Sequence, residues 1–248
     1  MEAPKLLGND TATLEQRIEA LEKQTASRNK DLADATAELE GFIYAVSHDL
    51  RAPLRSILAS CMILSEDHAG QIDEIGRDEL KRQAEAAKRL NGMLEELLQL
   101  SRLSRQEMKL EPVEFGGLAL EVARSLRAEE ALEVEPDIIA VADGPLLKLA
   151  LHNLIDNSVK FARKDEPLKI TVGRREERFF VKDNGRGFDM KRAGRIFLPF
   201  ERLNGEEFPG SGMGLTTVKR IVDRHHGRIE AEGAPGQGAT FWFTLGAQ

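Results

Sequence analysis

The chain has 248 residues and a formal charge of −7, from 35 Lys and Arg against 42 Asp and Glu. Its length allows one large domain or two small ones, and 41% hydrophobic residues are too many for a disordered protein. The acidic balance argues against a nucleic-acid surface. A single cysteine, Cys61, excludes an internal disulfide and a Cys-based zinc site. The sequence has neither an apolar run of the ~18 residues that span a membrane nor a secretory signal in its first ten residues, so we expect a cytoplasmic protein.

The first predicted element is a coiled-coil helix that starts at residue 13 and runs to about residue 48. Its seam positions follow steps of four and three without a break: Leu14, Ile18, Leu21, Thr25, Arg28, Leu32, Ala35, Leu39, Phe42 and Val46. This heptad pattern is typical of a parallel dimeric coiled coil, although the two polar positions in its middle weaken the seam. The alternative is a single amphipathic helix packed on its own domain.

A second long helix is predicted from about residue 73 to residue 105. Leu80, Ala87, Leu94 and Ser101 repeat every seven residues, and a polar link around residues 66–72 separates this helix from the first. Two amphipathic helices joined by a short link form a helical hairpin. Because one hairpin has little core, we expect two copies to pair as a four-helix bundle.

After Pro112 the sequence changes to a mixed α/β pattern. Helices are predicted near residues 117–131, 145–162 and 213–225, and strands at 138–141, 168–172, 179–181 and 239–245. Seven glycines lie between residues 185 and 214, which suggests a segment that wraps a ligand. We therefore expect a layered α/β domain of the sandwich type with a ligand site beside this segment.

Residues 47–54, SHDLRAPL, are the first group with chemical potential. The helical spacing of the neighbouring apolar residues turns His48 off the predicted buried face, and a neutral exposed imidazole is a competent nucleophile. The Asp49 carboxylate can accept a hydrogen bond from Nδ1, which leaves Nε2 free to attack. Arg51, three residues on, can offset phosphate charge, and Pro53 predicts a local bend. The alternative is an ordinary solvated helix face.

A second group, in the predicted helix 145–162, combines two amides with a cation. Asn153 and Asn157 are four residues apart and share one helix face, and Lys160 follows on the same side, before Phe161. Amide oxygens and an ammonium group suit a Mg²⁺ ion that carries phosphates. The alternative is that the two asparagines are ordinary solvent-exposed residues of a helix.

A carboxylate, Asp183, stands at the end of the predicted strand 179–181, before Gly185 and Gly187. It can accept a hydrogen bond from the exocyclic amine of adenine, which guanine lacks at that position, because a buried acceptor left unpaired is costly. An ordinary hairpin turn at Asn184-Gly185 is equally compatible with the segment.

The glycine-rich segment adds two aromatic residues, Phe197 and Phe200, which can cover a base or fill a core. Its end precedes the last predicted helix, where backbone N–H groups bind phosphate well; it reads Gly210, Ser211, Gly212, Met213, Gly214 and Leu215. Neither a Rossmann turn nor a P-loop fits, since no strand precedes these glycines and no Gly-Lys-Ser/Thr follows. Lys191, Arg192 and Arg202 flank the segment, and the sequence does not choose among them as phosphate contacts.

Together these segments resemble, in order, the H, N, G1, F and G2 boxes of sensor histidine kinases, from Phe42 to about Phe243. The H box leans toward the phytochrome-associated branch. The resemblance implies three parts after an irregular or tag-like start at 1–12: a coiled-coil signalling helix (13–41), a dimerising phosphotransfer hairpin (42–108) and an ATP-binding domain of the GHKL type (109–248). It gives His48 the role of phospho-acceptor, assisted by Asp49 and Arg51. Asn153 and Asn157 would hold Mg²⁺, and Asp183 would read adenine.

The resemblance also implies partners: a second copy of the chain, a separate response regulator that docks near His48, and an upstream sensor domain or partner protein. One departure is Ala52, where many family members carry Thr or Asn. A methyl group holds no water by hydrogen bonding, so we expect a weak phosphatase. Two other classes stay open, a non-kinase ATPase of the same fold, which usually has Glu in place of Asn153, and an inactive nucleotide-binding scaffold.

Overall fold

The computed structural model describes residues 7–105, 107–201 and 211–246. The chain forms two compact units, Met1–Leu50 and Arg51–Gln248. The first unit is helical, and the second contains a helical hairpin and an α/β domain. None of the described helices is both long and apolar enough to cross a membrane.

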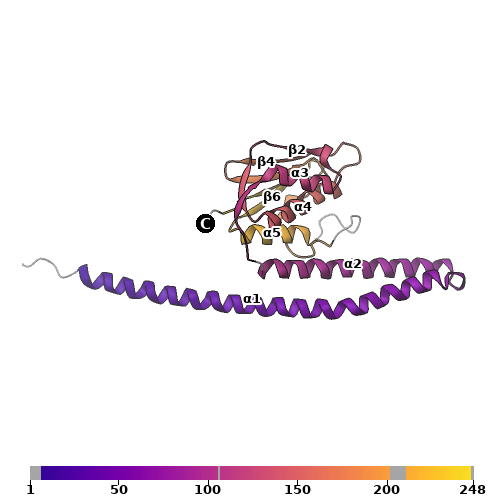
Figure 1. The fold of residues 1–248 in the computed structure, drawn as a ribbon, viewed down its shortest axis with the longest axis horizontal. Helices are drawn as coiled ribbons and strands as arrows, with labels where there is room; N and C mark the ends of the chain where they lie inside the picture. Colours follow the sequence, from indigo (N-terminus) through magenta and orange to yellow (C-terminus); the bar gives the residue numbers. More distant parts are fainter. Residues whose placement is uncertain (1–6, 106, 202–210, 247–248) are drawn as a thin grey trace, which may run out of the picture. The chain divides into compact units, whose positions relative to one another are not determined.

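Helix α1 (Leu7–Glu66) is continuous over 60 residues and supplies all described structure of the first unit (Figure 1). It starts earlier than residue 13, where the heptad pattern and the expected irregular start placed it. Once a helix has nucleated, each added residue costs little, and residues 7–12 contain no proline to stop it. The apolar seam residues are 54–66% exposed in the single chain: Ile18, Leu21, Leu32, Leu39 and Phe42. Pairing of this seam with a second chain stays a prediction.

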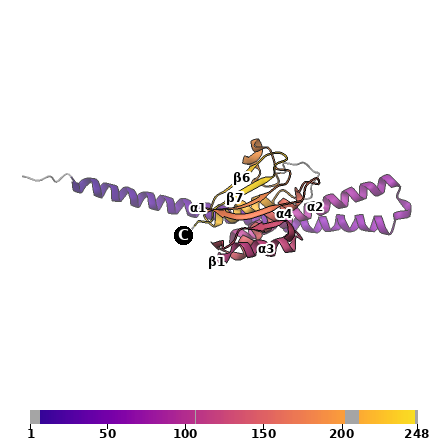
Figure 2. The same ribbon diagram turned by 90° about the horizontal axis from the view of Figure 1, so that it is seen from above.

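The predicted helical hairpin is present in the second unit. Helix α1 continues through Pro53 to Glu66, the 3₁₀ turn η1 (Ala69–Gln71) follows, and α2 (Glu74–Arg105) runs back beside it (Figures 1 and 2). Asp73 starts α2, because its carboxylate accepts a hydrogen bond from the Gly76 N–H at 2.8 Å, a typical N-cap. The buried residues of the hairpin include Leu54, Cys61, Ala87 and Leu98.

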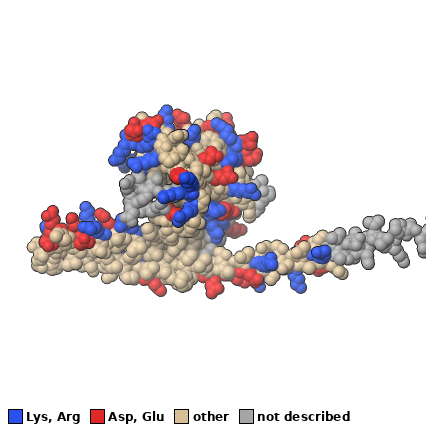
Figure 3. Space-filling model, turned by 180° about the vertical axis from the view of Figure 1, so that it is seen from behind, with Lys and Arg blue, Asp and Glu red and all other residues tan. Residues whose placement is uncertain are grey.

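The α/β domain begins after the hairpin. Its helices are α3 (Phe115–Ser125), α4 (Gly144–Lys160) and α5 (Gly214–Arg224), with short 3₁₀ turns η2 (Glu129–Ala131) and η3 (Met190–Arg195). Its strands are β1 (Glu111–Glu114), β2 (Leu132–Val134), β3 (Ile139–Ala142), β4 (Ile170–Arg175), β5 (Arg178–Asp183), β6 (Ile229–Gly233) and β7 (Ala239–Phe243). On the face shown in Figure 3, acidic and basic side chains are interspersed over this domain.

The main sheet has five strands in the order β2-β4-β5-β7-β6, and β1 and β3 form a separate antiparallel pair. Strand β2 runs parallel to β4, and the other neighbours are antiparallel. Helices α3, α4 and α5 pack in sequence against one another, and buried residues of all three share one core with the strands of the sheet; Figure 2 shows α3 and α4 beside the sheet. The result is the predicted α/β sandwich, and the structure shows that it has two layers and a mixed sheet.

The core lies between these two layers. Alternate residues of β5 and β7 point into it, including Phe179, Val181, Phe241 and Phe243, as expected for strands with one covered face. Helix α4 supplies Leu147, Leu151, Leu154 and Ile155, all completely buried. Helix α4 thus packs directly on the sheet, and the end of β5 meets the last turn of α4, where Ser158 lies 3.3 Å from Asp183.

The sequence reading of this domain needs two corrections. The helix expected at 117–131 ends at Ser125, because Arg127 adopts a left-handed conformation with φ of 55°. Strands β1, β2 and β6 were not predicted. Although β2 and β6 alternate apolar residues with glutamate, all three strands are only three to five residues long, which is too short for the pattern to be recognised.

Candidate functional site

The imidazole of His48 projects into solvent from α1. Its side chain is 70% exposed, and its Nδ1 lies 3.2 Å from Oδ1 of Asp49. Because the carboxylate can only accept, Nδ1 carries the proton of this hydrogen bond and Nε2 keeps its lone pair. The predicted orientation of His48 is confirmed. Arg51, predicted as an electrostatic partner, lies one turn further along α1 and is half-buried.

The apolar face predicted around His48 is only partly buried. Leu54 is buried, but Val46, Leu50 and Ile57 are 37–46% exposed in the single chain. The residue of this segment that is fully buried is Ser47, whose hydroxyl lacks a hydrogen-bond partner within the described chain. The prediction of one buried face is therefore wrong for the isolated chain, since the apolar stripe is broader than the surface that its own fold covers.

Helix α4 carries the amides and the cation of the second group. The Asn153 Nδ2 donates to the Leu149 carbonyl at 2.8 Å, and its Oδ1 lies against Gly214, where an added Cβ would come within 2.9 Å of it. Asn157, one turn further, is half-buried. Lys160 forms an ion pair of 2.5 Å with Asp156, so this ammonium group is held by a carboxylate in the structure.

Asp183 stands at the end of β5 and is only 7% exposed. Its Oδ1 accepts hydrogen bonds from the backbone N–H groups of Gly185 (2.8 Å) and Ala239 (3.2 Å). Its Oδ2 lies 3.3 Å from the Ser158 hydroxyl of α4. Burial raises the pKa of Asp183, and the three hydrogen bonds offset part of that rise.

The glycines after Asp183 allow a close approach between distant segments. A Cβ on Gly185 would lie 2.7 Å from the Phe161 carbonyl, and one on Gly187, which has φ of 61°, would lie 2.0 Å from the Ala234 carbonyl. The Phe161 carbonyl, at the end of α4, also accepts a hydrogen bond from the Arg186 N–H at 3.0 Å. The loop after β5 is thus fixed between α4 and the turn that joins β6 to β7.

The two aromatic residues of the glycine-rich segment differ in environment. Phe197 packs partly against the core, and its carbonyl accepts a hydrogen bond from Thr216 of α5 at 3.1 Å. Phe200 is 48% exposed and has a left-handed φ of 62°. Lys191 and Arg192 lie exposed in η3, whereas Arg202 lies outside the described residues.

The last glycine segment leads into α5. Gly210 lies outside the described residues. Gly212 has φ of 83°, and a Cβ there would come within 2.8 Å of the Glu201 carbonyl. The hydroxyl of buried Ser211 accepts a hydrogen bond from the Met213 N–H at 3.1 Å and donates to the Glu96 carboxylate. Met213 is buried, and Gly214 and Leu215 form the first turn of α5, beside Asn153.

Two buried polar residues of this region were not predicted from the sequence. Ser158, which is 1% exposed, contacts Asp183. His225, 2% exposed, accepts a hydrogen bond at Nε2 from the Asp143 N–H (3.0 Å) and donates from Nδ1 to the Ile221 carbonyl (2.8 Å), so it joins α5 to the start of α4. The spacing of Ser158 on the inner face of the helix was a usable signal for the first, but the partner of His225 is 82 residues away.

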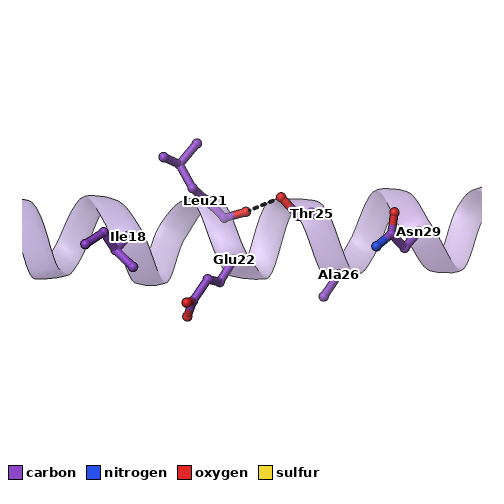
Figure 4. A pocket seen from close by; sticks show the side chains of 6 residues that line it. All are labelled: Ile18, Leu21, Glu22, Thr25, Ala26 and Asn29. Carbon is purple, nitrogen blue, oxygen red and sulfur yellow. Dashed lines mark hydrogen bonds between the residues drawn. The ribbon is translucent and has the colours of Figure 1, made fainter. Parts of the chain in front are cut away.

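An open groove also lies along the part of α1 that belongs to the first unit. It is lined by Ile18, Leu21, Glu22, Thr25, Ala26 and Asn29, with a hydrogen bond of 2.7 Å from the Thr25 hydroxyl to the Leu21 carbonyl (Figure 4). All six residues come from one helix, so this groove is part of the exposed seam rather than an enclosed ligand site. The described residues contain no group of three or more His, Cys, Asp or Glu side chains arranged to hold a metal ion.

Comparison with known families separates the chain into two matched parts. A model of the His Kinase A (phospho-acceptor) domain matches residues 38–106, and a model of the histidine kinase-, DNA gyrase B- and HSP90-like ATPase matches residues 142–248. The first match contains His48, and the second contains the N, G1, F and G2 segments described above.

Individual relatives are similar over most of the chain. Cyanobacterial phytochrome A from Nostoc sp. is 32% identical over 224 residues, 87% of this chain and 29% of that protein. The methanogenesis regulatory histidine kinase FilI of Methanothrix harundinacea is 34% identical over 221 residues, 84% of this chain and 25% of that protein. The fold is also similar to the crystal structure of full-length ShkA in complex with AMPPNP, with a TM-score of 0.56 and a sequence identity of 28%. The match covers 83% of this chain and 46% of that one.

The chain thus spans between 25% and 29% of the length of these two curated relatives. With a phospho-acceptor domain and an ATPase domain matched in that order, and relatives that are themselves histidine kinases, the chain belongs to the sensor histidine kinases.

Proposed function

We propose that this chain is an ATP-dependent protein-histidine kinase that phosphorylates its own His48 and passes the phosphate to an aspartate of a separate response regulator. The observation that carries the proposal is the exposed imidazole whose Nδ1 is engaged by Asp49, on the domain that matches the phospho-acceptor model. The relative crystallised with AMPPNP supports an adenine nucleotide as the phosphate donor.

The chemistry proposed for His48 follows from its hydrogen bond. Nε2 attacks the γ-phosphorus of ATP, a new N–P bond forms, and the bond to the oxygen of the ADP leaving group breaks. Asp49 holds the Nδ1 proton and stabilises the positive charge that grows on the ring, as an orienting carboxylate does for a nucleophilic or basic histidine. Arg51 contributes a permanent positive charge near the reacting phosphoryl group.

The nucleotide site proposed on the α/β domain has a base end and a phosphate end. Asp183 accepts a hydrogen bond from the adenine amine. The first turn of α5, with Ser211, Gly212, Met213 and Gly214, offers backbone N–H groups to the phosphates. Lys160 would reach the phosphates after releasing Asp156, and Phe161, Phe197, Phe200 and Leu215 would supply apolar walls.

The oxygens of Asn153 and Asn157 fit a Mg²⁺ site. The Asn153 amide is oriented by its bond to the Leu149 carbonyl, so that its oxygen faces the start of α5 rather than its own helix. Amide oxygens are hard ligands of the type that Mg²⁺ accepts beside phosphates and water. When bound, Mg²⁺ would neutralise charge on the triphosphate.

Radiolabelling separates the proposed kinase from a non-kinase ATPase and from an inactive scaffold. The purified chain is incubated with Mg²⁺ and γ-labelled ATP, and protein-bound label is tested for loss in acid and retention in alkali. We expect such label in the wild type and in His68→Ala, which removes another exposed histidine, but not in His48→Ala. Labelling of His48→Ala at the wild-type level would refute the assignment of His48.

The proposal includes partners of stated kinds. A second copy would cover the exposed apolar residues of α1 and complete a four-helix bundle with the hairpin. The response regulator would dock near His48, and an upstream sensor domain or partner protein would act through the coiled coil. Mixing the labelled chain with a purified receiver domain tests the phosphotransfer step, because label should move from an acid-labile, alkali-stable bond to an aspartyl phosphate.

A further inference from the structure

Ser158 is a buried hydroxyl at the base end of the proposed nucleotide site, and the function just proposed gives it no role. It lies on α4, is 1% exposed, and has two acceptors within reach of its single proton. The Leu154 carbonyl, one turn earlier in the same helix, is 3.2 Å away, and Oδ2 of Asp183 is 3.3 Å away. Because a hydroxyl donates one proton, only one of these two bonds can be made at a time.

The two oxygens of Asp183 are not equivalent. Oδ1 accepts from the N–H groups of Gly185 and Ala239, which come from different strand ends. Two donors use the lone pairs of that oxygen. Oδ2 faces the Ser158 hydroxyl and retains capacity for a further donor. An exocyclic amine that enters the site would therefore bind to Oδ2, the oxygen that Ser158 contacts.

The choice of acceptor favours Oδ2 whenever Asp183 is ionised. A hydrogen bond to a charged oxygen is stronger than one to a neutral carbonyl, and the Leu154 carbonyl belongs to a helix in which backbone N–H groups already satisfy the carbonyls. With the hydroxyl on one side of Oδ2 and the two N–H groups on Oδ1, the carboxylate is fixed at both ends. Without the hydroxyl, the Oδ2 side of the carboxylate would have no support from α4.

We propose that Ser158 is a positioning residue for purine selection, which holds Oδ2 of Asp183 in place as the acceptor for the 6-amino group of adenine. The inference rests on the proposed nucleotide site and adds to it a residue that determines base specificity. It acts through Asp183 and need not touch the nucleotide. Its contribution should therefore depend on the presence of an amine at position 6 of the purine.

The test compares two nucleotides that differ only in that amine. Dissociation constants of ATP and of purine riboside triphosphate, with hydrogen at position 6, are measured by calorimetry with Mg²⁺ for the wild type and Ser158→Ala. Ser125→Ala is the matched control, because the Ser125 hydroxyl also bonds back to its own helix, to the Val122 carbonyl at 2.7 Å, but belongs to α3. Thermal melting of each variant reports whether the fold is retained.

We expect the wild type and Ser125→Ala to prefer ATP, and we expect this preference to fall by about 3- to 10-fold in Ser158→Ala, the effect of one hydrogen bond. The loss should appear in ATP binding, with the affinity for purine riboside triphosphate nearly unchanged. An unchanged preference, or an equal loss for both nucleotides, overturns the role of Ser158. A wild type that binds neither nucleotide would instead refute the nucleotide site itself, so the two failures are distinguishable.

Discussion

Asp183 is a carboxylate that the fold buries, although burial disfavours its charged form. Burial raises its pKa, and hydrogen bonds from Gly185, Ala239 and Ser158 lower it only in part. For an acid whose pKa is raised on folding, the stabilising contribution is complete below the unfolded pKa and is lost as the pH rises through the folded pKa. At neutral pH the ionised group therefore costs stability, which is typical of a residue kept for binding.

The substitution Asp183→Asn separates the stability cost of the buried charge from the contribution of this side chain to binding. An asparagine can accept the two backbone N–H bonds at its oxygen and donate its amide to the Ser158 hydroxyl, so the local hydrogen bonds persist without a buried charge. We expect the melting temperature without nucleotide to stay the same or rise at pH 7, and ATP affinity to fall roughly 10- to 100-fold. A variant that binds ATP like the wild type would contradict the base-reading role of Asp183.

The pH dependence of ATP binding provides an independent check. An ionised Asp183 accepts the adenine amine in a stronger hydrogen bond than a protonated one, and burial raises the pKa of Asp183. ATP affinity, measured by calorimetry across acidic and neutral pH, should therefore decline at a higher pH than the titration of an ordinary aspartate. Affinity that stays constant down to the range of an exposed aspartate would be the opposite result. Purine riboside triphosphate, which lacks the amine, serves as the control ligand.

Ala52 predicts a low phosphatase activity. The residue is exposed on α1, one turn after His48, and its methyl group cannot orient a water molecule. Ala52→Thr should increase the rate at which the chain dephosphorylates a phosphorylated response regulator, by about 3- to 10-fold if one hydrogen bond to the water is gained. Release of phosphate from the regulator is measured with and without ADP. A fast wild-type rate that Ala52→Thr leaves unchanged would refute the interpretation.

At the scale of elements, the sequence predicted the helices and strands that show a strong hydrophobic periodicity within their own segment. Helices α2, α4 and α5 and the central strands β5 and β7 were predicted to within a few residues, whereas α1 extends beyond its predicted bounds to Leu7–Glu66. The short strands β1, β2 and β6 were not, since they depend on partners distant in sequence, such as β4 for β2. Local pattern identifies an element that carries its own hydrophobic face, but not one whose position is imposed by a neighbour.

The contact of His225 could not be predicted from the sequence either, because its partner is distant in the chain. We expect loss of this contact to lower the stability of the fold. Its ring joins the end of α5 to the N-terminus of α4 through the Asp143 N–H, and Asp143 in turn caps α4 by accepting from the Leu146 N–H at 3.1 Å. His225→Phe would keep a ring at this position but leave the buried Asp143 N–H unpaired, at a cost of about 1–3 kcal/mol, while the Ile221 carbonyl would still accept from the backbone N–H of residue 225 at 3.1 Å. Urea unfolding should show this loss of unfolding free energy.

The control for this prediction is the neighbouring histidine. His226 is exposed and has φ of 56°, a conformation that asparagine tolerates well, so His226→Asn should unfold like the wild type. Equal stability of His225→Phe and the wild type would show that the bridge between α4 and α5 contributes nothing.

At the scale of the whole molecule, the sequence offers the residue types of the proposed nucleotide site but not their mutual arrangement. Asn153 and Gly214 are 61 positions apart in the chain, yet an added Cβ on Gly214 would touch the Asn153 oxygen. The sequence also placed Lys160 at the phosphates, whereas the structure pairs it with Asp156. Packing of α4 against α5, which no single segment encodes, decides these relations.

The long helix α1 predicts a dependence of kinase activity on helical phase. Seven residues inserted after Lys30 preserve the seam, because seven residues are close to two helical turns, whereas three residues rotate everything that follows. Autophosphorylation of His48 should stay within about twofold of the wild type in the first variant, in line with the small per-residue cost of lengthening a helix. It should change severalfold in the second. Equal activities of the two variants would exclude transmission by rotation or register.

The bonds of Asp183 also provide an internal spectroscopic reporter. The Gly185 and Ala239 amide hydrogens point at the same carboxylate oxygen, although they belong to segments separated by more than fifty residues. Any change in the ionisation of that carboxylate must alter the magnetic environment of both hydrogens together. Two nitrogen-15 resonances moving in concert would therefore reveal the ionisation state of Asp183 in a resting sample, without a label on the nucleotide and without turnover.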